Sequence, residues 1–161
     1  MIRNRKLNRL TGFDYSNEGY YFVTICVKDK TEWFGEIKDG RMMLNEYGKI
    51  VKNRWVWLPK QYFYIQLDEF VVMSNHFHGI LSIVGNGRDR SVHKIKSLFE
   101  LIGAFKTTSS KLIHRAGLLE FQWQKSFYDH IIRNEQDLTR VREYIVNNPL
   151  KWEEDTENVK S

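Results

Sequence analysis

Residues 65–84, with the sequence IQLDEFVVMSNHFHGILSIV, decide the fold of this chain. The stretch is rich in β-branched and aromatic residues, which favour strands. Ser74 and Asn75 interrupt it with two residue types that are common in turns. We therefore predict two antiparallel strands joined by a tight turn, with His76 at the start of the second strand.

Another strand and a hairpin are expected on the N-terminal side. Residues 20–28, YYFVTICVK, predict a strand by the same composition. The dipeptide Asp39-Gly40 tolerates positive φ at both positions and is typical of a hairpin turn. Cys26, the single cysteine, lies in the predicted strand, so we expect a buried thiol without a function.

Helical spacing follows this hairpin. Asn45 is expected to cap a helix, because its side chain can accept hydrogen bonds from the free N–H groups of a first turn. In the following segment EYGKIVKNRWVWL, apolar residues form a helical stripe at Ile50, Val51, Trp55 and Leu58. Pro59 is predicted to stop this helix.

The C-terminal half predicts further helices. Apolar residues recur with helical spacing at Ile95, Leu98, Phe99 and Ile102. A shorter helical piece is expected to reach about Arg115, before Gly117. Asn134 is predicted to cap a last helix, from Glu135 to about Asn147, which Pro149 ends. The buried stripe of this last helix is expected at Leu138, Val141 and Ile145.

Strands and helices thus mix without a regular βαβ alternation or a glycine-rich phosphate loop. This order favours an α+β fold, with an antiparallel sheet and helices packed on it. The 161 residues, 42% of them hydrophobic, suit one globular domain. We expect a single domain over 1–161, with a basic N-terminal arm at 1–15 and a short acidic tail at 153–161.

Charge is segregated along the chain, whose formal net charge is +5. Residues 86–115 hold two acidic residues, Asp89 and Glu100, against seven basic ones. The basic residues are Arg88, Arg90, Lys94, Lys96, Lys106, Lys111 and Arg115. Clustered positive charge fits a phosphate backbone, so these seven are the predicted DNA-binding residues. The alternative is a solvated surface, the commoner fate of such runs.

Targeting signals are not evident. No apolar run approaches the ~18 residues that a membrane span needs. The N-terminal sequence MIRNRKLNRL lacks the apolar core of a secretory signal. We expect a cytoplasmic, nucleoid-associated protein.

His76 and His78 form the first chemical motif. Residues i and i+2 of a strand point to the same face, so these two imidazoles could share one metal ion while Phe77 points into the core. Alone the pattern is weak, because two ordinary polar strand residues would look the same. A third ligand is needed.

Tyr144 and Asn148 form the second motif. They are four residues apart near the end of the last predicted helix and lie on one face if helical geometry extends that far. Pro149 leaves that open for Asn148. The alternative is that Tyr144 packs against the core and Asn148 is a C-terminal helix residue.

Together, the two motifs resemble a known family. MSNHFHGIL followed by REYIVNNPLKW is similar to the IS200-type single-tyrosine transposases, which share the HUH (His-hydrophobic-His) endonuclease fold, and most closely to the branch associated with repetitive extragenic palindromes (REP). WQKSFYDHIIRNE and IGAFKTTSSKLI extend the resemblance over about Tyr20 to Trp152. Relatives often have proline where Ser74 stands. Because the tail after Trp152 is short and acidic, we expect no further DNA-binding extension.

The resemblance implies fold, activity and roles. It implies a ferredoxin/RRM-like sheet, His76 and His78 as metal ligands, Asn148 completing the site, and Tyr144 as nucleophile. The donor set suits Mg²⁺ or Mn²⁺. The implied reaction nicks and rejoins single-stranded DNA near palindromic hairpins through a 5′-phosphotyrosine. Relatives include both dimers and monomers, and a homodimer is the assembly that we favour. Tyr128, Asp129 and His130 are assigned structural roles.

Two rival functions stay open from the sequence. A replication-initiator or relaxase-like nickase would use the same chemistry. A non-catalytic, hairpin-binding regulator would use the fold alone, although all four motif residues are intact. A two-histidine RNA phosphodiesterase is discounted, because it needs a second His-x-Ser/Thr motif that the chain lacks.

The basic stretch yields a prediction. Charge reversal at Lys94, Lys96, Lys106 or Lys111 should weaken single-stranded DNA binding and reduce the slope of log affinity against log salt by about 0.7 per lost phosphate contact. Base preference should change little. Salt titrations of binding measure this, and unaltered slopes would mean that the stretch is only a solvated surface.

Overall fold

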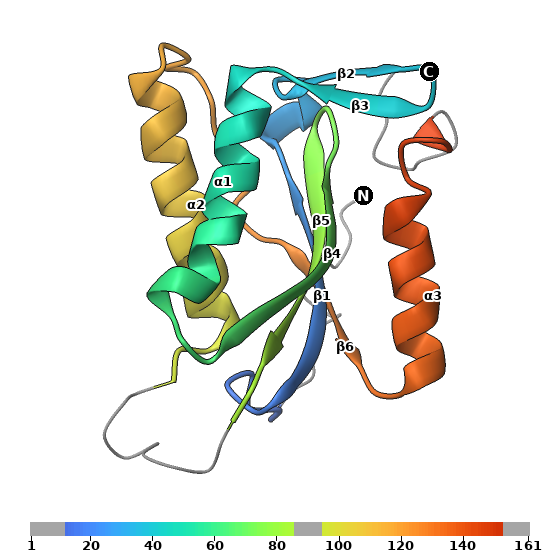
Figure 1. The fold of residues 1–161 in the computed structure, drawn as a ribbon. Coiled ribbons are helices and arrows are strands. Elements are labelled where there is room, and N and C mark those ends of the chain that lie inside the picture. Colours follow the sequence, from blue (N-terminus) through green and yellow to red (C-terminus); the bar gives the residue numbers. More distant parts are fainter. Residues whose placement is uncertain (1–11, 86–94, 153–161) are drawn as a thin grey trace.

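A four-stranded antiparallel sheet forms the centre of the computed structural model, which describes residues 12–85 and 95–152 (Figure 1). Its strands are β1 (Gly19–Cys26), β4 (Ile65–Val72), β5 (His76–Ile83) and β6 (Tyr128–Ile132). Their order across the sheet is β4-β5-β1-β6, with β5 and β1 in the middle. The predicted pair of strands on either side of Ser74 and Asn75 is confirmed.

Helices cover both faces of the sheet. In Figure 1, α1 (Glu46–Gln61) and α2 (Leu98–Arg115) lie together on one face and α3 (Glu135–Val146) lies alone on the other. Without β2, β3 and α3, the chain order is βαββαβ, the ferredoxin-like motif. The α+β class is therefore confirmed, and α3 is an addition to the open face of that motif.

Strand alternation divides the apolar side chains into two cores. Tyr21, Val23 and Ile25 of β1 join the large core beneath α1 and α2. Phe22 of β1 and Ile80 of β5 join a small core with Leu138, Val141 and Ile145 of α3. The predicted stripe of the last helix is thus confirmed. Because the central strands are covered on both faces, all eight residues of β5 are buried.

A hairpin and a capped helix follow β1. Strands β2 (Gly35–Lys38) and β3 (Arg41–Leu44) pair around the predicted turn, where Asp39 and Gly40 have φ of 53° and 74°. The Asn45 side chain accepts hydrogen bonds from the N–H groups of Tyr47 and Gly48, at 2.9 and 3.0 Å. Both expectations about this region are confirmed, and the hairpin lies at the same end of the molecule as the β4–β5 turn (Figure 1).

Two local predictions were wrong, and one strand was missed. Pro59 lies inside α1, which continues to Gln61, because burial of Trp55 and Leu58 holds the last turn on the sheet despite the missing N–H. The region up to Arg115 is one continuous helix with a capping box at Ser97 and Glu100, not two pieces. Strand β6 was not predicted, because its short sequence YDHII contains charged and polar residues that resemble a loop.

Some predicted features lie outside the described residues. These are the acidic tail and most of the basic arm, and also Arg88, Arg90 and Lys94. Within the described ranges, no helix is long and apolar enough to cross a membrane. Cys26 is buried and unpaired with another cysteine, as expected.

Candidate active site

His76 and His78 lie side by side on the α3 face of β5. Both imidazoles are buried, and their Nε2 atoms are 3.0 Å apart. The ring of Phe77 between them points to the opposite core, where it packs against Trp55 and Phe105. The predicted pairing of the two histidines is therefore observed.

Two neighbours hold these rings from behind. The amide oxygen of Asn75 is 2.8 Å from Nδ1 of His76, while the amide nitrogen of Asn75 donates to the carbonyl of Lys30. Since the Asn75 oxygen can only accept, Nδ1 of His76 carries the proton and its Nε2 keeps a lone pair. On His78, Nδ1 is 2.8 Å from the Thr24 hydroxyl. Both Nε2 atoms are thus directed at one point, as in sites where the second ring nitrogen orients a metal ligand.

Thr24 and Asn75 were missed by the sequence analysis. Asn75 directly precedes the histidine triplet, so its position carried a signal. Thr24 is 54 residues from His78 and meets it only through the β1–β5 register, which places the two residues opposite each other. No local pattern could have indicated that contact.

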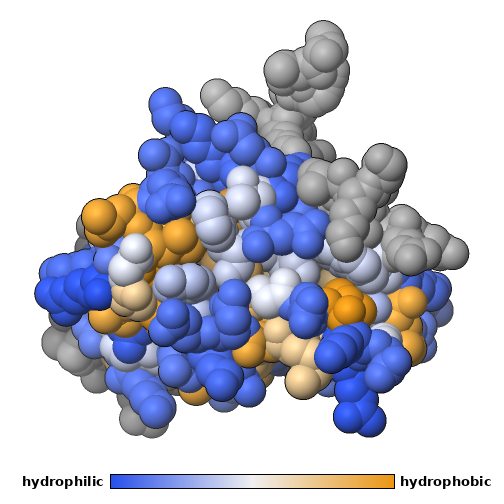
Figure 2. Space-filling view, turned by 90° about the horizontal axis from the view of Figure 1, so that it is seen from above, coloured by the Kyte–Doolittle hydropathy of each residue, from blue (hydrophilic) through white to orange (hydrophobic). Residues whose placement is uncertain are grey.

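Tyr144 lies beside the histidines, in the last turn of α3. Its ring centroid is 5.1 Å from that of His78, and Phe22 stacks on His78 and meets Tyr144 in a T-shaped contact. Unlike the histidines, Tyr144 is 46% exposed, so its hydroxyl is reachable from solvent. The end of the molecule seen in Figure 2 is mostly hydrophilic, with hydrophobic residues in separate patches.

Asn148 follows the helix and turns back toward it. Its amide nitrogen donates to the carbonyl of Tyr144 at 3.3 Å. The side chain is buried, yet its Oδ1 has no hydrogen-bond partner among the described residues. A buried acceptor without a partner costs free energy, which a bound cation would offset.

The donor set fits a divalent cation. Two neutral imidazoles and an amide oxygen carry no charge, so an ion such as Mg²⁺ or Mn²⁺ bound by them keeps its full positive charge. Within residues 12–85 and 95–152, no cluster of three His, Cys, Asp or Glu side chains could hold a metal ion. An amide as the third ligand is consistent with that result. The metal assignment of His76, His78 and Asn148 stays a prediction, supported by the unpaired oxygen.

Among the described residues, the predicted DNA-binding residues are not gathered at this site. Lys106, Lys111 and Arg115 belong to α2, on the opposite face of the sheet. The ammonium of Lys106 donates to the carbonyls of Gln124 and Lys125, which gives it a structural contact. Lys96 precedes α2, and its backbone N–H donates to the hydroxyl of Tyr64. Lys96 and Lys111 are therefore the cleaner positions for testing this stretch.

Polar contacts tie α3 down on both sides of its apolar stripe. Successive helical residues are about 100° apart, so Asp137 and Arg142 project to opposite flanks. Arg142 donates two hydrogen bonds to Asp68 of β4, at 2.8 and 2.7 Å. Asp137 accepts from His130 of β6 at 2.8 Å. These two ties set the rotation of the helix about its axis and hence the direction of Tyr144.

Comparison with other proteins shows what this chain is similar to. No protein-family model matches the chain. An uncharacterized protein of Haemophilus influenzae is 35% identical over 167 residues, covering 96% of this chain and 93% of that protein. A second Haemophilus influenzae protein, assigned as a REP-associated tyrosine transposase, is 23% identical over 145 residues, covering 86% of this chain and 74% of that protein. The chain is therefore similar in sequence to a REP-associated tyrosine transposase, as the sequence motifs led us to expect.

Two solved structures share the fold. One is of a REP-associated tyrosine transposase bound to a REP hairpin, with a TM-score of 0.61 at 20% identity over 89% of this chain and 72% of that chain. The other is of a Deinococcus radiodurans protein assigned as a transposase, with a TM-score of 0.54 at 15% identity over 86% of this chain and 97% of that chain. The arrangement of sheet and helices is thus that of transposases of this family.

The tie between Arg142 and Asp68 yields a prediction about stability and pH. The Arg142 guanidinium holds the pKa of the Asp68 carboxyl below its ordinary value. Asp68→Asn should lower the free energy of unfolding by roughly 1–2 kcal/mol, between an exposed ion pair and a buried charged hydrogen bond. Because the folded-state pKa is depressed, the loss should be complete above about pH 5 and shrink as pH falls through the folded pKa.

Glu69→Gln is the matched control, since Glu69 is the adjacent exposed carboxylate and both hydrogen bonds of Arg142 go to Asp68. Urea unfolding at a series of pH values measures both variants. Equal unfolding free energies for Asp68→Asn and Glu69→Gln at neutral pH would contradict a stabilising role of this tie.

Proposed function

We propose that this protein nicks and rejoins single-stranded DNA, with Tyr144 as the nucleophile. The observation that carries the proposal is the position of the Tyr144 ring, 5.1 Å from that of His78, whose Nε2 meets that of His76. An exposed phenol beside two buried, oriented imidazoles is an arrangement for chemistry, since packing alone would not require buried polar rings.

His76, His78 and Asn148 would hold a divalent cation at this point. When bound, such an ion neutralises charge on a phosphodiester and polarises its phosphorus. Asn75 and Thr24 hold the two imidazoles in their orientation, so little reorganisation is required. The stacked Trp152 ring, 6.4 Å from His76, covers the site on another side.

Tyr144 would exchange one phosphate ester for another. Its Oη forms a bond to phosphorus as the bond from phosphorus to the 3′ oxygen breaks. The phenolic proton leaves the tyrosine, and the 3′ oxygen takes up a proton, leaving a 5′-phosphotyrosine and a free 3′ hydroxyl. Attack by a 3′ hydroxyl on that ester reverses the step and restores the phenol. The number of phosphate esters is constant, so rejoining needs no ATP.

Hairpin DNA is the proposed substrate. A neighbour in fold was solved bound to a REP hairpin, which supports the same partner here. One chain brings Tyr144 and both histidines together, so this arrangement needs no second copy to complete the site. The homodimer that we favour from the sequence remains a prediction.

Removal of one oxygen tests the nucleophile. Tyr144→Phe keeps the ring that contacts Phe22 and His78, so the free energy of unfolding should change by no more than ~1 kcal/mol. Cleavage of a labelled hairpin oligonucleotide and the covalent protein–DNA adduct should both vanish. Hairpin binding should persist, because phosphate and base contacts do not require this hydroxyl.

Tyr62→Phe is the control, because Tyr62 lies at the end of α1 on the opposite face. It should form the adduct at the wild-type rate. An adduct formed by Tyr144→Phe would exclude this tyrosine as the nucleophile. A wild-type protein that binds hairpins without ever forming an adduct would support the non-catalytic regulator instead.

Substitution of the three ligands tests the metal site. His76→Ala, His78→Ala and Asn148→Ala should each abolish cleavage and weaken Mn²⁺ binding measured by calorimetry, while hairpin binding persists. Asn148→Ala should change the free energy of unfolding by less than about 1 kcal/mol, because it removes a weak hydrogen bond together with an unpaired buried oxygen. Cleavage that survives EDTA would contradict the metal assignment.

A further inference from the structure

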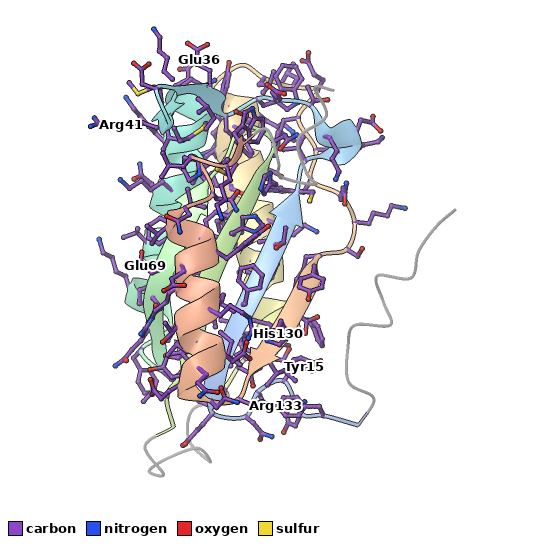
Figure 3. The ribbon with its side chains drawn as sticks, turned by 90° about the vertical axis from the view of Figure 1, so that its right-hand side faces the viewer. Tyr15, Glu36, Arg41, Glu69, His130 and Arg133 are labelled. Atoms are coloured by element: carbon purple, nitrogen blue, oxygen red, sulfur yellow. The ribbon has the colours of Figure 1, made fainter. Side chains whose placement is uncertain are left out.

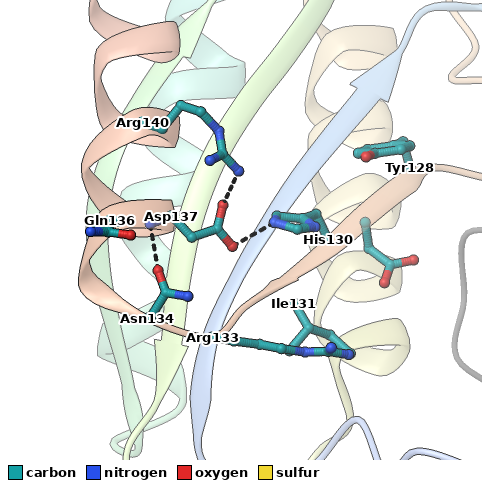
Figure 4. Close-up of a pocket in the computed structure, with 9 residues that line it drawn as sticks. Tyr128, His130, Ile131, Arg133, Asn134, Gln136, Asp137 and Arg140 are labelled. Carbon is teal, nitrogen blue, oxygen red and sulfur yellow. Dashed lines mark hydrogen bonds and ion pairs between the residues drawn. The ribbon is translucent and has the colours of Figure 1, made fainter.

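A polar pocket of about 490 Å³ lies next to the site, between edge strand β6 and the first turn of α3 (Figure 4). Tyr128 and His130 line it from the strand, Arg133 from the connection, and Asp137 and Arg140 from the helix. None of these residues has a role in the proposed chemistry. The lining is polar, with Arg133, Arg140 and His130 against Asp129 and Asp137, and it has an aromatic ring at one end.

The sheet register places the pocket on the same face of the sheet as the active site. Thr24, which contacts His78, is paired with Tyr128 of β6. Phe22, which stacks on His78, is paired with His130. Paired residues lie on the same face, so Tyr128 stands two strands, or about 10 Å, from His78 on the face that carries the active site. Figure 3 shows His130 and Arg133 on the β6 side of α3.

Charge inside the pocket favours an anion. The Asp137 carboxylate already accepts hydrogen bonds from His130 and Arg140, so its negative charge is offset. Arg133 is exposed, and within the described residues its guanidinium has no hydrogen bond or ion pair. A free guanidinium beside a neutralised carboxylate is a strong partner for a phosphate oxygen.

We propose that this pocket binds one nucleotide of the DNA strand, a short distance along the chain from the phosphate that Tyr144 attacks. Arg133 and Arg140 contact its phosphate, and its base packs against Tyr128. Stacking of an unpaired base on an aromatic side chain is worth ~1–3 kcal/mol, which is enough to hold the strand in register. The proposal rests on the proposed function, because the strand reaches the pocket only if its cleaved phosphate lies at the histidines.

A protein–DNA double-mutant cycle tests the phosphate contact. The probes are hairpin oligonucleotides, each carrying one neutral methylphosphonate at a different position. The measurements use the Tyr144→Phe protein, which cannot cleave the probe. A methylphosphonate at one position near the cleavage point should lower its affinity for the hairpin roughly tenfold. Arg133→Gln should lower the affinity for the unmodified hairpin by a similar factor and reduce the slope of log affinity against log salt by about 0.7. The affinity of this variant should no longer depend on whether that one position carries a methylphosphonate.

Lys52→Gln is the control, because Lys52 is exposed on α1, across the sheet from the pocket. It should keep the full sensitivity to the modified position. The proposal is overturned if the affinity losses caused by Arg133→Gln and by the methylphosphonate add up at every position. It is also overturned if Lys52→Gln removes the sensitivity to the modified position in the same way. Unfolding midpoints of both variants should equal that of the parent, since both side chains are exposed.

A second cycle tests the base contact. Tyr128→Leu keeps an apolar contact with Phe22 but removes the flat ring. An abasic nucleotide next to the sensitive phosphate should lower the hairpin affinity of the parent Tyr144→Phe protein. It should not change the hairpin affinity once Tyr128→Leu is added to that protein. If the abasic nucleotide lowers the hairpin affinity of both proteins equally, the base does not pack against Tyr128. Adduct formation by the wild-type protein separates the two ideas: coupling without an adduct refutes the proposed chemistry alone, whereas an adduct without coupling refutes the pocket alone.

Discussion

The register between β1 and β5 is the constraint on which the rest of this structure depends. It places Thr24 opposite His78 and Phe22 opposite Ile80, which puts the histidines and the small core under the same helix. A slip of one residue would turn the imidazoles toward the large core and Phe77 toward α3. The buried apolar residues on both faces make such a slip expensive. Core packing thereby fixes the direction of the polar groups.

Local sequence signals predicted most of the elements. The Ser74-Asn75 interruption, the Asp39-Gly40 turn and the caps Asn45 and Asn134 act within a few residues, and all are observed. The same reasoning failed for β6 and Pro59, where contacts distant in sequence override local preference. An edge strand with the sequence YDHII is stabilised by pairing with β1, which no window of the sequence shows.

The candidate site divides in the same way. His76, His78, Tyr144 and Asn148 were recognisable because their motifs are local and resemble a family. Thr24 was hidden because it meets His78 across strands. The placement of the α2 lysines was also hidden, because charge counted along a chain does not say which face of a sheet a helix covers. The unpaired oxygen of Asn148 depends on packing, which no local sequence pattern shows, and it supports the predicted metal site.

The presence of both the phenol and the imidazoles in one chain has a genetic consequence. Under the proposed function, each copy of the protein would carry a complete site, with its nucleophile on α3, two ligands on the sheet beneath it and the third, Asn148, just after the helix. Under the proposed function, a copy defective in the tyrosine and a copy defective in a histidine could not restore activity to one another when produced in the same cell. Complementation between such alleles would require an exchange of α3 between chains, against both polar ties that hold it.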